Sequence, residues 1–254
     1  MKRTIIFLSI LFLLISSNCY SAYINGSSAL LTQNYANQLE TWLNEGPITL
    51  TRIFSKSING SSSSAFHNNV DGKGRTFSLI KVDGGYDELI GGYNPTSWDT
   101  STNYRHSLNT GDYSAFIFNL TENRIHRQIG NKSQYYQTYN NINYGPTFGG
   151  GHAIYVNANL SSGYTITHYT YNLTQNLNGY YTYGGGDGRN ILGDAAYYDN
   201  GTGPGNTTHS YSYNLVYGDI ETFTIQTGVP IPEVNSFILI IIVITGFIWI
   251  RSNL

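Results

Sequence analysis

Hydrophobic positions recur at helical spacing in one stretch near the N-terminus, SSALLTQNYANQLETWL. Four apolar residues at spacings of four, four and three lie on one helical face: Leu31, Tyr35, Leu39 and Trp42. Ser27 or Ser28 can cap this helix, and Gly46-Pro47 stops it. The pattern predicts one amphipathic helix over residues 28–43.

Most other apolar positions alternate with polar ones over short runs, which is typical of half-buried strands. The expected strands are ITLTRIF, RTFSLIKV, ELIGGY, YSAFIFNL, NRIHRQI, HAIYVN, YTITHYTYN and DIETFTIQ. Asp83-Gly84-Gly85 makes a hairpin-like connection, and SSSSAFHNNV predicts a short helix capped by one of its serines. This pattern predicts a mainly β fold, a β-sandwich of two antiparallel sheets with a few flanking short helices.

Both ends of the chain are hydrophobic. Lys2 and Arg3 precede an apolar run and then SSNCYSA, so residues 1–22 have the layout of a secretory signal peptide; use of Cys19 as a lipoprotein acceptor is an alternative. Residues 237–250, FILIIIVITGFIWI, are followed by Arg251 and predict a transmembrane helix with its C-terminus inside. A buried strand or helix is the alternative, since about 20 residues are needed to span a bilayer.

The segment before this apolar run, VPIPEVNS, contains a Pro-Glu element. Residues 229–254 therefore resemble a PEP-CTERM sorting tail of Gram-negative bacteria that make exopolysaccharide. Val234 stands where that family usually has proline, and Arg251 stands alone where it has an arginine cluster, so a plain anchor is the alternative. The resemblance implies a protein exported across the inner membrane, anchored or released to the cell surface, with membrane sorting machinery as a partner.

Composition narrows the function classes. The one cysteine, Cys19, leaves with a signal peptide, so the mature chain would have no disulfide and no thiol chemistry. The formal net charge is −2, with no basic run, which disfavours nucleic acid as a ligand. The 23 tyrosines, with abundant Asn, Ser, Thr and Gly, suit short strands joined by turns and equally suit a sugar-binding face.

Five segments occur in the order and spacing of a TLDc domain, the module of the oxidation-resistance protein family: DGKGRTFSLIKV, LIGGYNPTSW, YSAFIFNL, YGPTFGGGHAIYVNANLSSG and GDIETFTI. The matching positions are Asp71 to Lys81, Gly91-Gly92-Tyr93 with Trp98, Phe116 to Leu120, Gly149 to Gly151, and Glu221 with Phe223. The chain resembles this family over about Ile48 to Thr227. The resemblance implies a two-sheet sandwich with flanking helices, placed here in residues 23–228.

The chain also departs from the family. THYTYN stands where the family has a Cys-x-Thr-Phe-x-Asn type signature, and a polar insertion follows at about 180–214. Eukaryotic members protect cells from oxidative damage and bind the vacuolar proton pump, a partner that an exported bacterial protein would not meet. The resemblance therefore implies a fold more firmly than a function.

Histidines and serines give no recognisable catalytic motif. The six histidines show no His-x-His or i,i+4 ligand spacing: His67, His106, His126, His152, His168 and His209. Ser61 to Ser64 lie at a turn and helix start, and no Gly-x-Ser-x-Gly elbow occurs. We therefore expect no metal, no cofactor and no catalytic triad.

Acidic residues give the better enzymatic hypothesis. Asp83, Asp87 and Glu88 share one turn, and Asp187 and Asp194 flank a glycine-rich loop, so a glycosidase-like carboxylate pair is conceivable. Solvated turn residues are the simpler interpretation. GGGDGRNILGD is similar to one calcium-binding nonapeptide copy, but such sites need stacked repeats, so we interpret it as a flexible loop.

The glycine triplet in GPTFGGGHAIYV invites a functional interpretation. No helix and no Lys-Ser/Thr pair follow it, so it lacks the helix N-terminus of a phosphate loop. We interpret Gly149 to Gly151 as a bend ahead of a core strand, and His152 as the first residue of that strand.

Three functions remain as hypotheses. The first is a non-catalytic exported TLDc-like protein of the cell surface or extracellular matrix. The second is a carbohydrate-binding module, in which surface tyrosines and Trp98 form a platform for exopolysaccharide. The third is a glycoside hydrolase with carboxylates from the turns around Asp83 and Asp187.

Overall fold

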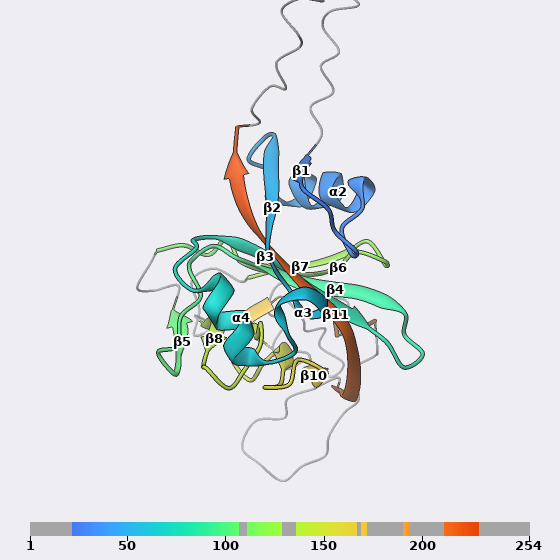
Figure 1. Ribbon diagram of the computed structural model, residues 1–254, viewed down its shortest axis with the longest axis vertical. Helices are drawn as coiled ribbons and strands as arrows, with labels where there is room; N and C mark the ends of the chain where they lie inside the picture. Colours follow the sequence, from blue (N-terminus) through green and yellow to red (C-terminus); the bar gives the residue numbers. More distant parts are fainter. Residues whose placement is uncertain are drawn as a thin grey trace, which may run out of the picture.

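The computed structural model describes residues 22–106, 111–128, 136–166, 169–171, 190–193 and 211–228 (Figure 1). The predicted signal peptide, most of the 180–214 insertion and the predicted C-terminal membrane segment lie outside this part of the chain. Within the described part, no helix is long and apolar enough to cross a membrane.

One large sheet forms the centre of the fold. Its antiparallel strands follow the order β2 (Ile48–Ser55), β11 (Tyr211–Thr227), β3 (Thr76–Val82), β4 (Glu88–Asn94), β6 (Phe116–Asn119) and β7 (Arg124–Arg127). The edge strand β1 (Tyr23–Asn25) pairs with β2 in parallel. Helix α2 (Gln33–Leu43) connects these two strands, as parallel neighbours require a crossover connection.

A second layer lies against one face of this sheet. Its strand β10 (Ser162–Ile166) pairs with both β11 and β9 (Ile154–Val156). The ladder of β5 (Asn103–His106) and β8 (Tyr136–Asn140) reaches β9 through two isolated bridges made by Phe148.

The sequence-based expectation of two antiparallel sheets needs correction. The fold is mainly β, but in the described part of the chain hydrogen bonds join nine strands into one mixed sheet, and β5 and β8 form a separate pair. The reason is β11, whose 17 residues are long enough to serve both layers. Its register against β3 shifts between Tyr217 and Ile220, and such irregularities bend a strand.

The helices are short. Helix α2 begins at Gln33 and not at residue 28, because Thr32 is its cap and accepts from the Tyr35 amide at 3.3 Å. The expected serine cap of the second helix is confirmed: Ser62 accepts from the Ala65 amide at 3.1 Å and starts α4 (Ser63–Val70). A one-turn helix, α3 (Lys56–Asn59), and a 3₁₀ turn (Tyr169–Tyr171) complete the described set.

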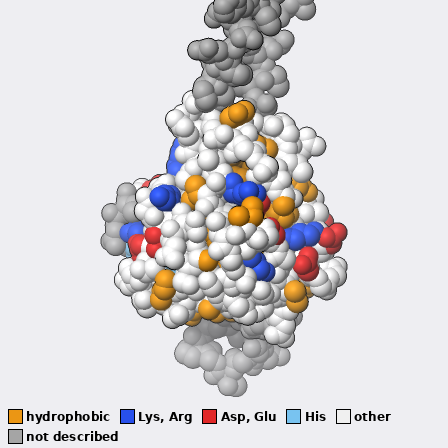
Figure 2. All heavy atoms as spheres, viewed as in Figure 1, with side chains coloured by type: hydrophobic (Ala, Val, Ile, Leu, Met, Phe, Trp, Pro, Cys, Tyr) orange, Lys and Arg blue, Asp and Glu red, His pale blue; other side chains and the backbone are white. Residues whose placement is uncertain are grey.

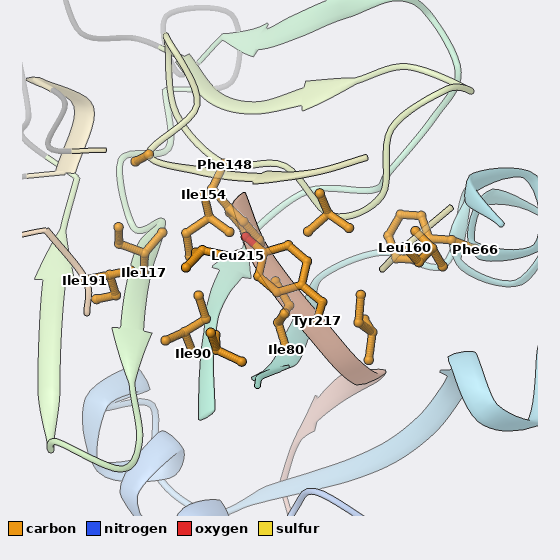
Figure 3. Close-up of a cluster of buried hydrophobic side chains, with 14 of the residues drawn as sticks. Phe66, Ile80, Ile90, Ile117, Phe148, Ile154, Leu160, Ile191, Leu215 and Tyr217 are labelled. Atoms are coloured by element: carbon orange, nitrogen blue, oxygen red, sulfur yellow. The ribbon is translucent and has the colours of Figure 1, made fainter. Parts of the chain in front are cut away.

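Two hydrophobic cores cover the two faces of the large sheet. The core under α2 contains Phe77 and Leu79 of β3, and the core under the second layer and α4 contains Ile80 and Val82 of the same strand. Figure 3 shows the latter core, in which Ile90 and Ile117 of the large sheet face Phe148, Ile154 and Leu215. Strand β3 carries apolar side chains toward both cores, because both of its faces are buried.

The Gly-Gly step in β4 makes room for aromatic rings on both faces. A Cβ on Gly91 would lie 2.8 Å from the Phe118 ring, and one on Gly92 would lie 2.6 Å from the Phe148 ring. Both distances are far shorter than carbon contacts at optimal separation. These glycines therefore let the two layers pack closely at the centre of the sheet.

Two segments differ from their expected structure. Within the stretch YTITHYTYN, the described residues through Ile166 belong to strand β10, and Tyr169–Tyr171 form a 3₁₀ turn. Residues 211–214, assigned from the sequence to the polar insertion, already belong to β11.

Candidate functional site: a tyrosine surface around His152

Six tyrosines from the second layer, together with His152, form a continuous half-buried aromatic cluster, called here the tyrosine surface: Tyr104, Tyr136, Tyr139, Tyr144, Tyr155 and Tyr164. They come from β5, β8, the loop after β8, β9 and β10. In the order 136, 104, 139, 144, 155, 164, successive ring centroids are 4.5, 4.7, 5.2, 5.0 and 4.8 Å apart. These separations are typical of interacting aromatic rings.

His152 lies in the middle of this cluster. Its ring centroid is 5.2 Å from Tyr139, 5.8 Å from both Tyr144 and Tyr155, 6.0 Å from Tyr104 and 6.5 Å from Tyr164. Because five rings lie this close to one imidazole, the cluster is compact and not a single line along one strand.

Strand pairing places the rings on one side of the second layer. Tyr104 faces Tyr139 across the β5–β8 ladder, and Tyr155 faces Tyr164 across the β9–β10 ladder. Directly opposed residues on antiparallel strands bring their side chains together. The two ladders thus supply two ready-made tyrosine pairs.

The glycine triplet builds the floor between these ladders. A Cβ on Gly150 would lie 2.6 Å from the Tyr136 ring, so only glycine lets that ring lie against the backbone. Gly149 and Gly151 have φ of +83° and +71°, and the Gly151 backbone amide contacts the Tyr104 hydroxyl. The triplet is therefore part of the candidate site as well as a bend.

His152 is not the first residue of a strand, contrary to the sequence-based expectation. Its φ is +66° and its amide donates to the Gly149 carbonyl at 3.1 Å, so it belongs to a tight left-handed turn, and β9 begins at Ile154. A positive φ is uncommon for residues other than glycine and often marks a functional or strained position. Here it turns the imidazole toward the tyrosine rings.

The tyrosine surface is electrically neutral. Burial raises the pKa of Tyr104 and of Tyr155 and lowers the pKa of His152, whose nearby Gly149 carbonyl offsets this only in part. The Tyr104 and Tyr155 phenols and the His152 imidazole are therefore uncharged at neutral pH. The His152 Nδ1 is buried and has no hydrogen-bond partner among the residues that the structure describes, which is unusual for a buried polar atom.

A histidine of helix α4 holds one loop of this surface in place. His67 of α4 has Nδ1 2.7 Å from Asp71 Oδ1, while its Nε2 lies 2.9 Å from the Asn141 carbonyl and 3.1 Å from the Tyr144 carbonyl. His67 is buried. Its contacts therefore fix the loop that carries Tyr144, which is a structural task and not a ligand position.

The remaining histidines do not assemble a metal site in the described residues, where no group of three potential metal ligands occurs. His106 packs against Tyr136 at 4.7 Å, beside the tyrosine surface, and His126 is buried on β7. His168 and His209 lie outside the described residues.

Trp98 is not part of an exposed platform. It is fully buried, packs edge-on against Phe66 and Phe148 at 5.5 and 5.4 Å, and donates from Nε1 to Thr76 Oγ1 at 2.9 Å. The assignment of Trp98 to a binding face is wrong, because its ring fills the core between the layers and its one polar atom is satisfied there.

Each candidate carboxylate in the described part of the chain contacts a different group. Asp87 is exposed and pairs with Lys81, Glu88 accepts from Asn119, and Asp83 lies against the backbone of Gly218. Asp187 and Asp194 lie outside the described residues.

Two of the candidate serines make hydrogen bonds that stabilise the fold. Ser62 caps α4, and Ser63 donates to the Ile142 carbonyl at 2.6 Å.

The molecule is thus a mainly β domain, with one mixed sheet and one antiparallel strand pair, that carries a compact, uncharged aromatic surface. A model of the TLDc domain matches residues 24–189, which is more than half of the chain, so the chain belongs to the TLDc domain family. No curated protein matches it. The matched range includes the Gly-Gly step and the glycine triplet, and β11 follows it in the chain.

Sequence reasoning missed the tyrosine surface as a unit. The signal that could have found it is local: Tyr139 and Tyr144 precede the triplet, His152 follows it at once, and Tyr155 comes three residues later. Only the pairing of β5 with β8 and of β9 with β10 brings Tyr104 and Tyr164 to the same place.

Proposed function

We propose that this TLDc domain protein is a non-catalytic exported protein of the cell surface or extracellular matrix that binds an uncharged polysaccharide through its tyrosine surface. The carrying observation is the unbroken chain of six half-buried tyrosine rings around His152. Aromatic faces pack against the apolar face of a sugar ring, and phenol hydroxyls add hydrogen bonds at its edge.

The neighbourhood of the rings supports a hydroxyl-rich ligand. Asn103, Asn141, Asn143 and Asn157 stand within two residues of a surface tyrosine in the sequence and are exposed or half-buried. Amides offer both donors and acceptors, as sugar hydroxyls require. An aromatic centre with amides nearby therefore suits a saccharide.

The charge distribution favours a neutral ligand over an anionic one. The tyrosine surface itself consists of neutral groups, and the adjacent Arg105 is already paired with Asp99. On the face shown in Figure 2, positive and negative side chains occur in small groups among uncharged atoms, with no large area of one charge. Recognition of an acidic polysaccharide would need unpaired Arg or Lys beside the rings.

Export rests on the two ends of the chain. The signal-like residues 1–22 and the PEP-CTERM-like residues 229–254 support transport across the inner membrane, followed by anchoring or release, with the sorting machinery as a partner. Cell fractionation with mass spectrometry of both mature termini tests this part. Uncleaved full-length protein in the cytosol would overturn it.

Binding is tested by sedimentation of the purified protein with an insoluble neutral glucan, in parallel with an anionic polysaccharide such as alginate. We expect retention by the neutral polymer, lost in Tyr155→Ala and retained in Tyr23→Ala, because Tyr23 is 48% exposed but lies on β1, outside the cluster. Absence of retention on neutral polymers, or equal loss in both variants, would contradict the proposal.

A further inference from the structure

Tyr155 and Tyr164 form a pair unlike the other tyrosine contacts of the surface. They are direct partners across the β9–β10 ladder, and their rings are stacked at 29° with centroids 4.8 Å apart. The successive contacts of Tyr104, Tyr136, Tyr139 and Tyr144 are tilted or edge-on, at 45–60° for these pairs. Both Tyr155 and Tyr164 are half-buried, so each residue is partly exposed to solvent.

The backbones under this pair are held close together. A Cβ on Gly163 would lie 1.9 Å from the Tyr155 carbonyl oxygen and 2.7 Å from the Tyr217 ring, so glycine allows β10 to approach both. The buried Tyr217 hydroxyl donates to the Tyr155 carbonyl at 3.0 Å and lies 3.5 Å from the Tyr164 carbonyl. The backbone positions that carry the two phenols are therefore held close to each other.

We propose that Tyr155 and Tyr164 are a dityrosine cross-linking site, joined when the surface meets a one-electron oxidant such as a peroxidase supplied with hydrogen peroxide. Two radicals held side by side react at a high effective concentration. Coupling within this pair therefore outcompetes coupling between two molecules.

The cross-linking reaction needs no reagent other than the peroxidase and hydrogen peroxide. Each phenol loses one electron and one proton to give a phenoxyl radical. The radicals join by a new carbon–carbon bond between ring carbons ortho to the oxygens, and each ring then regains aromaticity by moving its ortho hydrogen to oxygen. One hydrogen peroxide takes up the two electrons and two protons and leaves as two water molecules.

The cross-link would tie β9 to β10 covalently across the turn at 157–161. It would lock the part of the tyrosine surface that these strands carry. This inference does not depend on polysaccharide binding, because it needs only the ring pair and an oxidant.

The test treats dilute, folded, full-length protein with a peroxidase and hydrogen peroxide. Dityrosine fluorescence is followed, and the cross-linked peptides are mapped by mass spectrometry. We expect a monomeric product that has lost two hydrogen atoms, with a cross-link between Tyr155 and Tyr164 and a yield independent of protein concentration. Tyr155→Phe and Tyr164→Phe each keep the ring and remove the phenol, so both should abolish this product.

Tyr104→Phe is the matched control and should leave the product unchanged, since Tyr104 belongs to the other ladder. Protein unfolded in denaturant is the second control, and it should give much less of the Tyr155–Tyr164 cross-link. A cross-link that maps to another tyrosine pair, an equal yield in the unfolded chain, or no cross-link at all would overturn the proposal.

Discussion

Arg52 Nη1 donates to Glu221 Oε1 at 2.6 Å, and the Glu221 side chain is fully buried in the middle of the large sheet. The same carboxylate accepts from Ser28 Oγ and from the amides of Ala29 and Leu30, the latter two at 3.2 and 3.3 Å. A buried carboxylate is tolerated only with such a complete set of donors. Glu221 thus fastens the segment between β1 and α2 to strand β11.

Removal of this carboxylate should be strongly destabilising. Glu221→Ala leaves a largely buried guanidinium and backbone amides without a partner, and we expect a loss of about 3–5 kcal/mol in the free energy of unfolding, measured by urea denaturation. Glu45→Ala removes the exposed pair with Arg75 and should cost at most about 1 kcal/mol. Equal effects of the two substitutions would contradict the role assigned to Glu221.

The Gly92–Phe148 contact predicts a steric penalty. In Gly92→Ala the new methyl group meets the Phe148 ring at 2.6 Å, and overpacking of a core costs about 1–3 kcal/mol. Phe148→Leu should relieve part of this clash, so the double variant should lose less than the sum of the single losses in a double-mutant cycle. Additive losses would show that the ring and the glycine do not meet.

The burial of His152 leads us to expect that the protein becomes less stable below neutral pH. Burial lowers its pKa in the folded protein, so below about pH 6.5 the unfolded chain binds more protons than the folded one. The free energy of unfolding should therefore fall as the pH decreases through this window.

His152→Asn is the matched variant, because asparagine tolerates the left-handed backbone and carries no titrating group. The difference in stability between wild type and variant should change between pH 7 and pH 5 in thermal or urea unfolding. A pH-independent difference would mean that the pKa of the imidazole is the same in the folded and the unfolded protein.

Individual rings of the tyrosine surface should contribute measurably to ligand binding. For a neutral glucan oligomer, Tyr144→Ala should raise Kd about tenfold, or about 1.4 kcal/mol, whereas Tyr144→Phe should keep most of the affinity because the stacking face remains. Isothermal titration gives both values. Full affinity in the alanine variant would place the ligand elsewhere.

Local parts of this fold could be predicted from the sequence because local chemistry decides them. The serine-capped helix α4 and the β3–β4 hairpin follow from capping and alternation within a few residues. The start of α2 was misplaced because Ser28, a good cap by type, accepts from the Leu31 amide at 2.6 Å but also donates to Glu221, 193 residues away along the chain, and the helix begins only after Thr32.

The sequence could predict the type of candidate site, an aromatic surface, but not the residues that form it. Tyrosine abundance suggested an aromatic face, yet nothing local distinguishes the half-buried Tyr155 from the buried Tyr171 and Tyr217, because burial depends on which layer covers each strand. Trp98 was expected on the binding surface for the same reason, yet it is fully buried. Composition identified a kind of surface, and strand pairing selected its members.

The position of β11 has a consequence for how the chain is made. This strand is the last described element in the sequence, yet it lies between β2 and β3 at the centre of the sheet (Figure 1). Until β11 emerges from the ribosome, no strand joins the β1–β2 pair to the β3–β4 hairpin, and contacts between residues so far apart form slowly. A nascent chain that stops at residue 189 would therefore still be unfinished at its centre, and completion of the domain must wait for its final strand.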